Sequence, residues 1–156
     1  MNVLNEISEL LEDFHKVAQL AGVSLNPESI SFEVLPAPHK PPSNLPVGKA
    51  GVYVFVYNEQ CFKVGKVGSK SKARFTSQHY NPKSSVSNLA KSVLGDFEKL
   101  GLKGINELNV GDWVKDNCHR INFFVDVSCG ISVVTLLEVF LQCRLNPRYE
   151  GFLSQK

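Results

Sequence analysis

Two β-rich segments separated by a few polar residues place the strongest constraint on the fold of this chain. Residues 51–57 read GVYVFVY, and residues 61–64 read CFKV. β-Branched and aromatic side chains of this kind favour strands, and the residues NEQ between them favour a tight turn. The pattern predicts an antiparallel hairpin, after which Gly65 and Gly68 allow the chain to turn sharply.

Helices are expected on both sides of this hairpin in the sequence. Apolar residues at helical spacing predict a helix over residues 3–21. SVVTLLEVFLQCRL predicts a second over residues 132–145, which is apolar on nearly every side and therefore expected to be buried. The other expected elements are strands at 30–34 and 120–127 and helices from Ser69 or Ser71 to about Tyr80, from Ser84 or Ser85 to near Gly101, and around Trp113.

This order of elements predicts an α/β (α+β) fold: a small, mostly antiparallel three-stranded sheet flanked by helices, with an N-terminal helical arm. Five prolines fall in the segment LPAPHKPPSNLPVGKAG, which reads as an extended connector. We therefore expect residues 1–47 to form the arm, with its helix, short strand and connector, and residues 48–156 to form the main domain. The arm is too small to hold a core of its own.

Composition removes several classes of protein from consideration. The chain has 156 residues, of which 43% are hydrophobic and 21% are charged, as in ordinary globular proteins. It has no apolar run of about 18 residues, and its acidic, amphipathic start does not read as a signal peptide. The cysteines are widely spaced, which favours free thiols and a cytoplasmic location over a zinc site or disulfides. They are Cys61, Cys118, Cys129 and Cys143.

Charge is unevenly distributed although the net charge is only +2. The segment from Cys61 to Gly95 has no acidic residue and seven basic ones. A basic segment in a nearly neutral protein predicts a phosphate-facing surface, with an ordinary solvated face as the alternative. The basic residues are Lys63, Lys66, Lys70, Lys72, Arg74, Lys83 and Lys91.

The hairpin carries a group that can move a proton. Tyr53 on its first strand and Lys63 on its second can be near neighbours. A free tyrosine has a pKa of about 10, and a cation such as Lys63 or Lys66 beside it lowers that pKa. Alternatively, a lysine whose pKa other cations lower is the base. Taken singly, Tyr53 reads more simply as a core aromatic and the lysines as a solvated strand edge.

Glu138 lies in the middle of the apolar helix over residues 132–145. Thr135 and Gln142 share its helix face, so the three form a narrow polar strip. Because an unpaired buried carboxylate is costly, the strip needs a cation, a metal ion or water opposite it. A structural ion pair and a strip facing solvent are the simpler alternatives. The guanidinium of Arg74 can donate two parallel hydrogen bonds to a phosphate, although taken alone Arg74 reads as an exposed surface charge.

Taken together, these residues resemble the GIY-YIG nuclease superfamily over approximately residues 48–151. GVY at 51–53 corresponds to GIY and KVG at 63–65 to YIG, an arginine follows nine residues after Gly65, and the glutamate of an apolar helix precedes PRY at 147–149. The superfamily includes homing endonucleases, the incision domain of a bacterial excision nuclease, and type II restriction enzymes. Lys63 replaces the second tyrosine, as in some restriction-enzyme members, which places the resemblance nearest to that branch.

The resemblance implies a role for each matching residue. Tyr53 would be a general base or orient the attacking water, Lys66 would assist proton transfer, and Arg74 would bind phosphate. Glu138 would hold one Mg²⁺ or Mn²⁺ ion, which stabilises the leaving 3′ oxygen while water attacks in line. The candidate catalytic set also includes Lys63 and His79, the latter five residues after Arg74, and the candidate DNA-binding residues are Lys70, Lys72, Lys83 and Lys91.

The implied function is that of a metal-dependent DNA endonuclease, a phosphodiester hydrolase acting on double-stranded DNA. A restriction-type enzyme working as a homodimer is one form of it, and a repair or mobile-element nuclease is another. A nucleic-acid-binding module in which Lys63 marks a lost catalytic site is the alternative from a different class. A weakly specific toxin or antiphage nuclease is a third interpretation.

Overall fold

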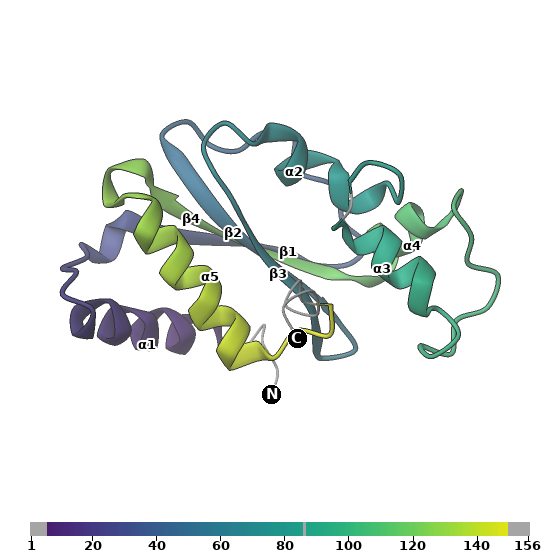
Figure 1. The fold of residues 1–156 in the computed structure, drawn as a ribbon, viewed down its shortest axis with the longest axis horizontal. Coiled ribbons are helices and arrows are strands. Elements are labelled where there is room, and N and C mark those ends of the chain that lie inside the picture. The colour runs from purple at the N-terminus through teal and green to yellow at the C-terminus, as the bar shows by residue number, and fades with distance from the viewer. Residues whose placement is uncertain (1–5, 86, 150–156) are drawn as a thin grey trace.

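The computed structural model describes residues 6–85 and 87–149. Its centre is an antiparallel sheet of four strands in the order β1-β4-β2-β3 (Figure 1). The strands are β1 Ile30–Leu35, β2 Lys49–Tyr57, β3 Gln60–Val67 and β4 His119–Asp126. The prediction of a mixed α/β fold with an antiparallel sheet is confirmed.

The prediction of three strands is wrong, because the short strand expected in the N-terminal arm belongs to the same sheet. β1 pairs antiparallel with β4 along its whole length, from Ile30 opposite Val125 to Leu35 opposite Arg120. Pairing satisfies the backbone groups on one edge of β1. The arm is thereby joined to the central sheet.

The predicted hairpin is formed by β2 and β3. Its turn consists of Asn58 and Glu59, which have φ angles of 46° and 62°. Two successive residues with positive φ are the requirement of a type I′ turn, whose twist matches that of the flanking strands. The turn brings Tyr57 opposite Gln60 and sets the register of the hairpin.

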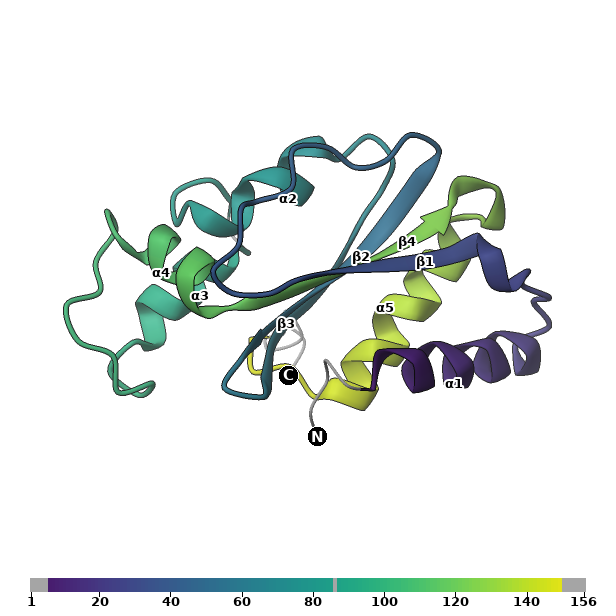
Figure 2. The same ribbon diagram turned by 180° about the vertical axis from the view of Figure 1, so that it is seen from behind.

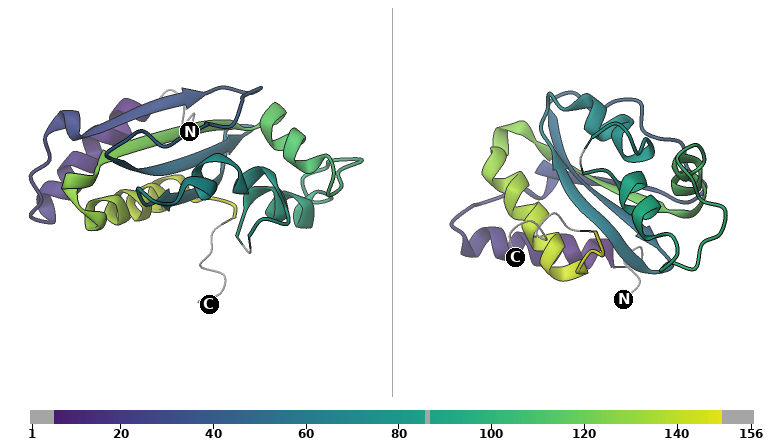
Figure 3. Two further views of the ribbon diagram at one scale, coloured as in Figure 1. Left: turned by 90° about the horizontal axis from the view of Figure 1, so that it is seen from above. Right: turned by 45° about the vertical axis from the view of Figure 1, so that its right-hand side comes forward.

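Helices cover the two faces of the sheet in two groups (Figures 1 and 3). α1 Ile7–Leu20 and α5 Ile131–Leu145 share one core with the β2 side chains of Val52, Val54 and Val56. The opposite core contains Tyr53 and Phe55 of β2 together with residues of three shorter helices. These are α2 Lys72–Thr76, α3 Leu89–Asp96 and α4 Val110–Asn117, and the 3₁₀ turns are η2 Pro27–Ser29, η3 Gln78–Tyr80 and η4 Val127–Cys129.

Several helices are shorter than predicted. The helix expected to reach Tyr80 divides into α2 and the 3₁₀ turn η3. The next helix begins at Leu89 because the Asn88 side chain caps it, accepting the Lys91 backbone N–H at 2.8 Å. The expectation for α1 included Val3 and Leu4, which lie outside the described residues.

The prediction that the apolar last helix is buried is confirmed for one side of α5 and wrong for the other. Val133, Leu137 and Leu141 of α5 are buried, whereas Ile131 and Val139 are 61% and 41% exposed. The sheet and α1 pack against α5 from one side, and its outer side keeps apolar residues at the surface.

The proline-rich connector packs against the chain's own α4 (Figure 2). His39 donates its backbone N–H to Lys115 O at 2.9 Å, and its Nδ1 lies 2.9 Å from Cys118 O. Among the described residues, no helix is long and apolar enough to span a membrane. Cys118, Cys129 and Cys143 carry free thiols, as expected.

Candidate active site

A polar cavity of about 140 Å³ lies at the β3 edge of the sheet. It brings together five of the six residues predicted to be catalytic, from β2, β3, α2 and α5. The described residues that line it are Tyr53, Lys63, Val64, Gly65, Lys66, Arg74, Ser87, Glu138 and Gln142.

Tyr53 reaches the cavity because its partner on β3 is a glycine. Tyr53 is opposite Gly65 in the hairpin. A Cβ added at Gly65 would overlap the hydroxyl and ring atoms of Tyr53, so the tyrosine passes over the space that another side chain would fill. β3 is the edge strand, and the side chain therefore extends from the sheet interior toward the sheet edge.

Glu138 approaches the same edge from the other face of the sheet, on α5. Its Oε1 accepts the backbone N–H of Lys66 at 3.0 Å, and its Oε2 lies 3.0 Å from the Lys66 ammonium. Lys66 Nζ also donates to Thr135 Oγ1 at 3.1 Å. The polar strip predicted on this helix therefore faces a cation, and the simpler expectation of an ion pair describes its contacts in this structure.

Lys63 is buried, and its ammonium donates to Ser87 Oγ at 3.1 Å. A longer contact of 3.5 Å joins the ammonium to Tyr149 O. The segment after α5 runs beside β3, since Arg148 N and Tyr149 N donate to Cys61 O and Phe62 O. The C-terminal segment and the Ser87 loop thus fix a lysine that the hairpin alone would leave at a strand edge.

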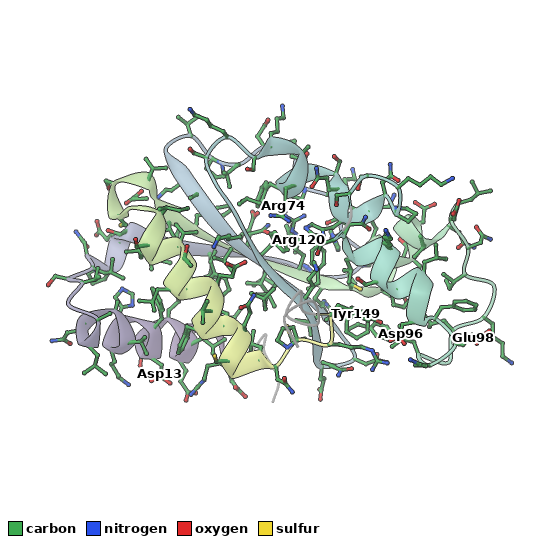
Figure 4. All side chains as sticks on the ribbon, in the orientation of Figure 1. Asp13, Arg74, Asp96, Glu98, Arg120 and Tyr149 are labelled. Carbon is green, nitrogen blue, oxygen red and sulfur yellow. The ribbon has the colours of Figure 1, made fainter. Side chains whose placement is uncertain are left out.

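Asp96 at the end of α3 holds this C-terminal segment in place (Figure 4). Its Oδ2 accepts hydrogen bonds from Arg148 Nε at 2.8 Å and from the Tyr149 hydroxyl at 3.0 Å. Burial opposes ionisation, but these hydrogen bonds outweigh it and hold the pKa of Asp96 below its ordinary value. The contact joins the end of α3 to the segment following α5, whose Tyr149 carbonyl lies 3.5 Å from the Lys63 ammonium.

His79 does not line the cavity. It is buried, its ring centroid lies 4.4 Å from that of Tyr53, and its Nδ1 accepts the Leu89 backbone N–H at 3.3 Å. Burial, together with the cations Arg120, Lys63 and Arg74, lowers the pKa of His79 to about 2. The imidazole is therefore neutral at physiological pH and packs beside Tyr53.

Two groups near the site were missed by the sequence interpretation. Ser87 contacts Lys63, and Arg120 on β4 lies fully buried with its guanidinium carbon 5.8 Å from the Tyr53 ring centroid. Arg120 and Asn122 alternate with the apolar residues Ile121 and Phe123 in β4. That alternation could have identified Arg120 as a polar residue in a buried strand. The loop around Ser87 has no comparable pattern.

The predicted DNA-binding lysines differ in their surroundings. Lys70, Lys72 and Lys91 are exposed, and within the described ranges none of them has a carboxylate within 4.0 Å. Lys83 instead forms an ion pair of 2.6 Å with Glu107. The first three are available to an anionic partner, while Lys83 is already neutralised.

The donor set fits a magnesium ion held by few protein ligands. The described residues contain no group of three or more histidines, cysteines or acidic residues able to form a metal cage. Mg²⁺ commonly binds through one or two carboxylates and keeps several waters. Among the described residues that line the cavity, Glu138 is the one carboxylate, and its Oε2 already attracts a cation, the Lys66 ammonium.

The chain matches no protein-family model, no curated protein and no solved structure.

Proposed function

We propose that this protein is a metal-dependent DNA endonuclease that hydrolyses phosphodiester bonds. The observation that supports the proposal is the cavity at the edge of β3. A tyrosine, two lysines and an arginine from residues 53–74 line it together with a carboxylate that lies far along the chain, Glu138.

The charge of the cavity suits a phosphodiester. Of the described residues that line it, Lys63, Lys66 and Arg74 are cations and one, Glu138, is a carboxylate. Arg74 is exposed, so its guanidinium can donate two parallel hydrogen bonds to phosphate oxygens and stabilise charge that develops on them. The Lys63 ammonium, fixed by Ser87, adds a second positive group.

Tyr53 and Lys66 are the groups of this chain that can handle the attacking water. The Tyr53 side chain extends over Gly65 to the cavity, where its hydroxyl can orient a water molecule or accept its proton. Glu138 would hold Mg²⁺ or Mn²⁺, which supplies a Lewis acid for the phosphate and the leaving oxygen. Lys66, released from Glu138, would then be close enough to assist proton transfer.

A non-catalytic nucleic-acid-binding module is the second candidate function. The contact that favours it is the Lys66–Glu138 ion pair, in which an ammonium already neutralises the carboxylate that would hold a metal. In such a module the cations would still attract phosphate, and no bond would be cut.

Incubation with supercoiled plasmid DNA and Mg²⁺ or Mn²⁺ separates the two functions. The endonuclease predicts nicked or linear products that are lost in Glu138→Gln and Arg74→Ala. Arg144→Ala and Glu12→Gln, which alter exposed residues of α5 and α1 that do not line the cavity, are the matched controls and should cut normally. DNA binding without cleavage in either metal would support the module and overturn the proposal.

A restriction-type enzyme that acts as a homodimer on duplex DNA is the finer form of the proposal. It predicts discrete product ends of one sequence and dimer formation on DNA. Sequencing of the ends and light scattering of free and DNA-bound protein test it. Random ends would favour a weakly specific nuclease, and a monomer in both states would contradict the dimer.

A further inference from the structure

Arg120 is a buried cation that the proposed chemistry does not use. It lies on β4 and is 0% exposed, and no carboxylate of the described residues comes within 4.0 Å of it. Burying a guanidinium without a direct counterion is expensive. An apolar residue would fill the same space without this cost in folding free energy, so the buried charge and its several N–H donors need an explanation.

The guanidinium connects the sheet to the helix that carries Arg74. Arg120 Nη2 donates to Phe75 O at 2.7 Å, and Phe75 is the neighbour of Arg74 in α2. α2 has only five residues, too few for a helix to be stable by itself. Its placement over the sheet therefore depends on contacts of this kind, and Figure 4 shows Arg120 and Arg74 in this central region.

The same guanidinium packs against aromatic rings of the sheet and of α2. Its central carbon lies 5.8 Å from the ring centroid of Tyr53, 5.2 Å from that of Phe55 and 4.8 Å from that of Phe75. Cations attract the faces of aromatic rings at these distances. Arg120 thus contacts the tyrosine of the cavity as well as the backbone beside its arginine.

Hydrogen bonds with a defined direction hold Arg120 in place. Nη1 donates to the Tyr80 hydroxyl at 3.0 Å, and Tyr80 lies 2.8 Å from His39 Nε2. His39 Nδ1 faces the carbonyl of Cys118, which can only accept, so Nε2 of the neutral ring accepts from Tyr80. On the other side, Arg120 Nε donates to Asn122 Oδ1 at 2.8 Å.

We propose that Arg120 is the positioning residue of this site, which sets Arg74 through Phe75 O and supports the Tyr53 ring from the sheet side. Its consequence for catalysis rests on the proposed function, whereas its consequence for the position of α2 does not. Arg120 acts through these two residues and has no contact with the substrate.

The structural part is tested by amide hydrogen exchange in Arg120→Met and Arg120→Lys. The amides to follow are those of Phe75 and Ser77, which donate to the first and last turns of α2 at Ser71 O and Ala73 O. Both variants are expected to exchange at least about tenfold faster at these amides, because one lysine head cannot replace three forked hydrogen bonds. Ile121→Val, at the next position of β4 but in the opposite core, is the matched control and should leave them unchanged. Unchanged exchange in folded Arg120 variants would overturn the proposal, whatever the activity of the protein.

The catalytic part is tested by a double-mutant cycle of Arg120→Met with Arg74→Ala, measured on plasmid DNA far below the melting temperature. Arg120→Met alone should slow cleavage by about 10- to 100-fold at saturating DNA and add little to Arg74→Ala. Fully additive losses would show that Arg120 does not act through Arg74. If Arg120→Met does not fold, Tyr80→Phe removes the hydroxyl that accepts from Arg120 Nη1. This variant must then speed exchange at the Phe75 and Ser77 amides. Faster exchange in a protein that never cuts DNA would overturn the proposed function and support the positioning role.

Discussion

Tyr53 passes directly over Gly65, its cross-strand partner, so closely that a Cβ at position 65 would overlap the tyrosine hydroxyl. Because Gly65 has no side chain, the Tyr53 side chain can extend from the inner strand β2 across β3 to the edge of the sheet. Glu138 comes to the same edge from α5 on the other face. The two faces of the sheet therefore contribute to one cavity.

Gly65→Ala is expected to displace the Tyr53 ring and to reduce cleavage by at least about 100-fold. Overpacking should cost about 1–3 kcal/mol of unfolding free energy. Gly68→Ala is the control, because nothing lies within 4 Å of a Cβ added there. Plasmid cleavage and thermal unfolding of both variants check this, and equal activity of the two would contradict it.

Removal of the Lys66 ammonium should free one oxygen of Glu138 for a metal ion. The ion pair is partly exposed, with the Lys66 side chain at 34%, so it contributes about 1 kcal/mol or less. Lys66→Met should therefore bind Mn²⁺ up to about fivefold more tightly while cutting DNA more slowly. Titration by electron paramagnetic resonance measures the affinity, and Glu138→Gln should bind least. Weaker binding by Lys66→Met than by the unmodified chain would refute the competition.

Replacing Lys70, Lys72 and Lys91 with alanine should weaken DNA binding and flatten its salt dependence. Each lost phosphate contact reduces the slope of log K against log salt by about 0.9 on duplex DNA, so the triple variant should lose about 2 to 3 in slope. Lys83→Ala should have a smaller effect, because Glu107 already neutralises that lysine. Fluorescence anisotropy at several salt concentrations checks both. An unchanged slope in the triple variant would show that these lysines do not contact the DNA phosphates.

Acid should destabilise the protein through His79. Burial, with the nearby cations Arg120, Lys63 and Arg74, lowers the pKa of His79 to about 2 from 6.5. The unfolded state then binds more protons than the folded state below pH 6.5, so this contribution is complete above that pH and is lost as the pH falls toward 2. By pH 4.5 the loss reaches about 2–3 kcal/mol.

Urea unfolding at pH 7.5 and 4.5 measures this loss, and His79→Gln should be less sensitive to pH by the same amount. The pKa of His39 is also lowered, by burial and then by Arg120 and His119, against the opposing effect of the Cys118 carbonyl. His39 also destabilises the folded state as the pH falls, so the His79→Gln variant keeps part of the pH dependence of stability. An identical pH dependence with and without His79 would show that the imidazole is not held neutral by the fold.

Deletion of residues 1–47 should prevent folding of the remainder. Without β1, the edge of β4 from Arg120 to Val125 loses its partner strand, and without α1 the core residues of α5 lose part of their cover. The fragment 48–156 should show no cooperative thermal transition by circular dichroism. A cooperative transition with native-like near-ultraviolet signals would mean that the arm is dispensable.

Local patterns were enough to predict the hairpin and the type of most elements, and the family resemblance added five residues that line the cavity. Alternating β-branched and aromatic residues on either side of the turn residues NEQ act within a few positions of one another. So does the helical spacing that places Thr135, Glu138 and Gln142 on one strip. The overestimated lengths of α2 and α3 show the limit of such patterns. The Asn88 cap determines where α3 begins, and similar polar residues lie just before it.

The sequence by itself determined the hairpin, with Tyr53 and Lys63 on its strands, and the strip around Glu138, because these depend on neighbours along the chain. Only the tertiary structure decided that β1 pairs with β4, that Lys66 meets Glu138 at the sheet edge, and that Arg120 is buried between Tyr53 and α2. These contacts join residues far apart in the sequence. Sheet order and register set their distances, and no local propensity encodes either.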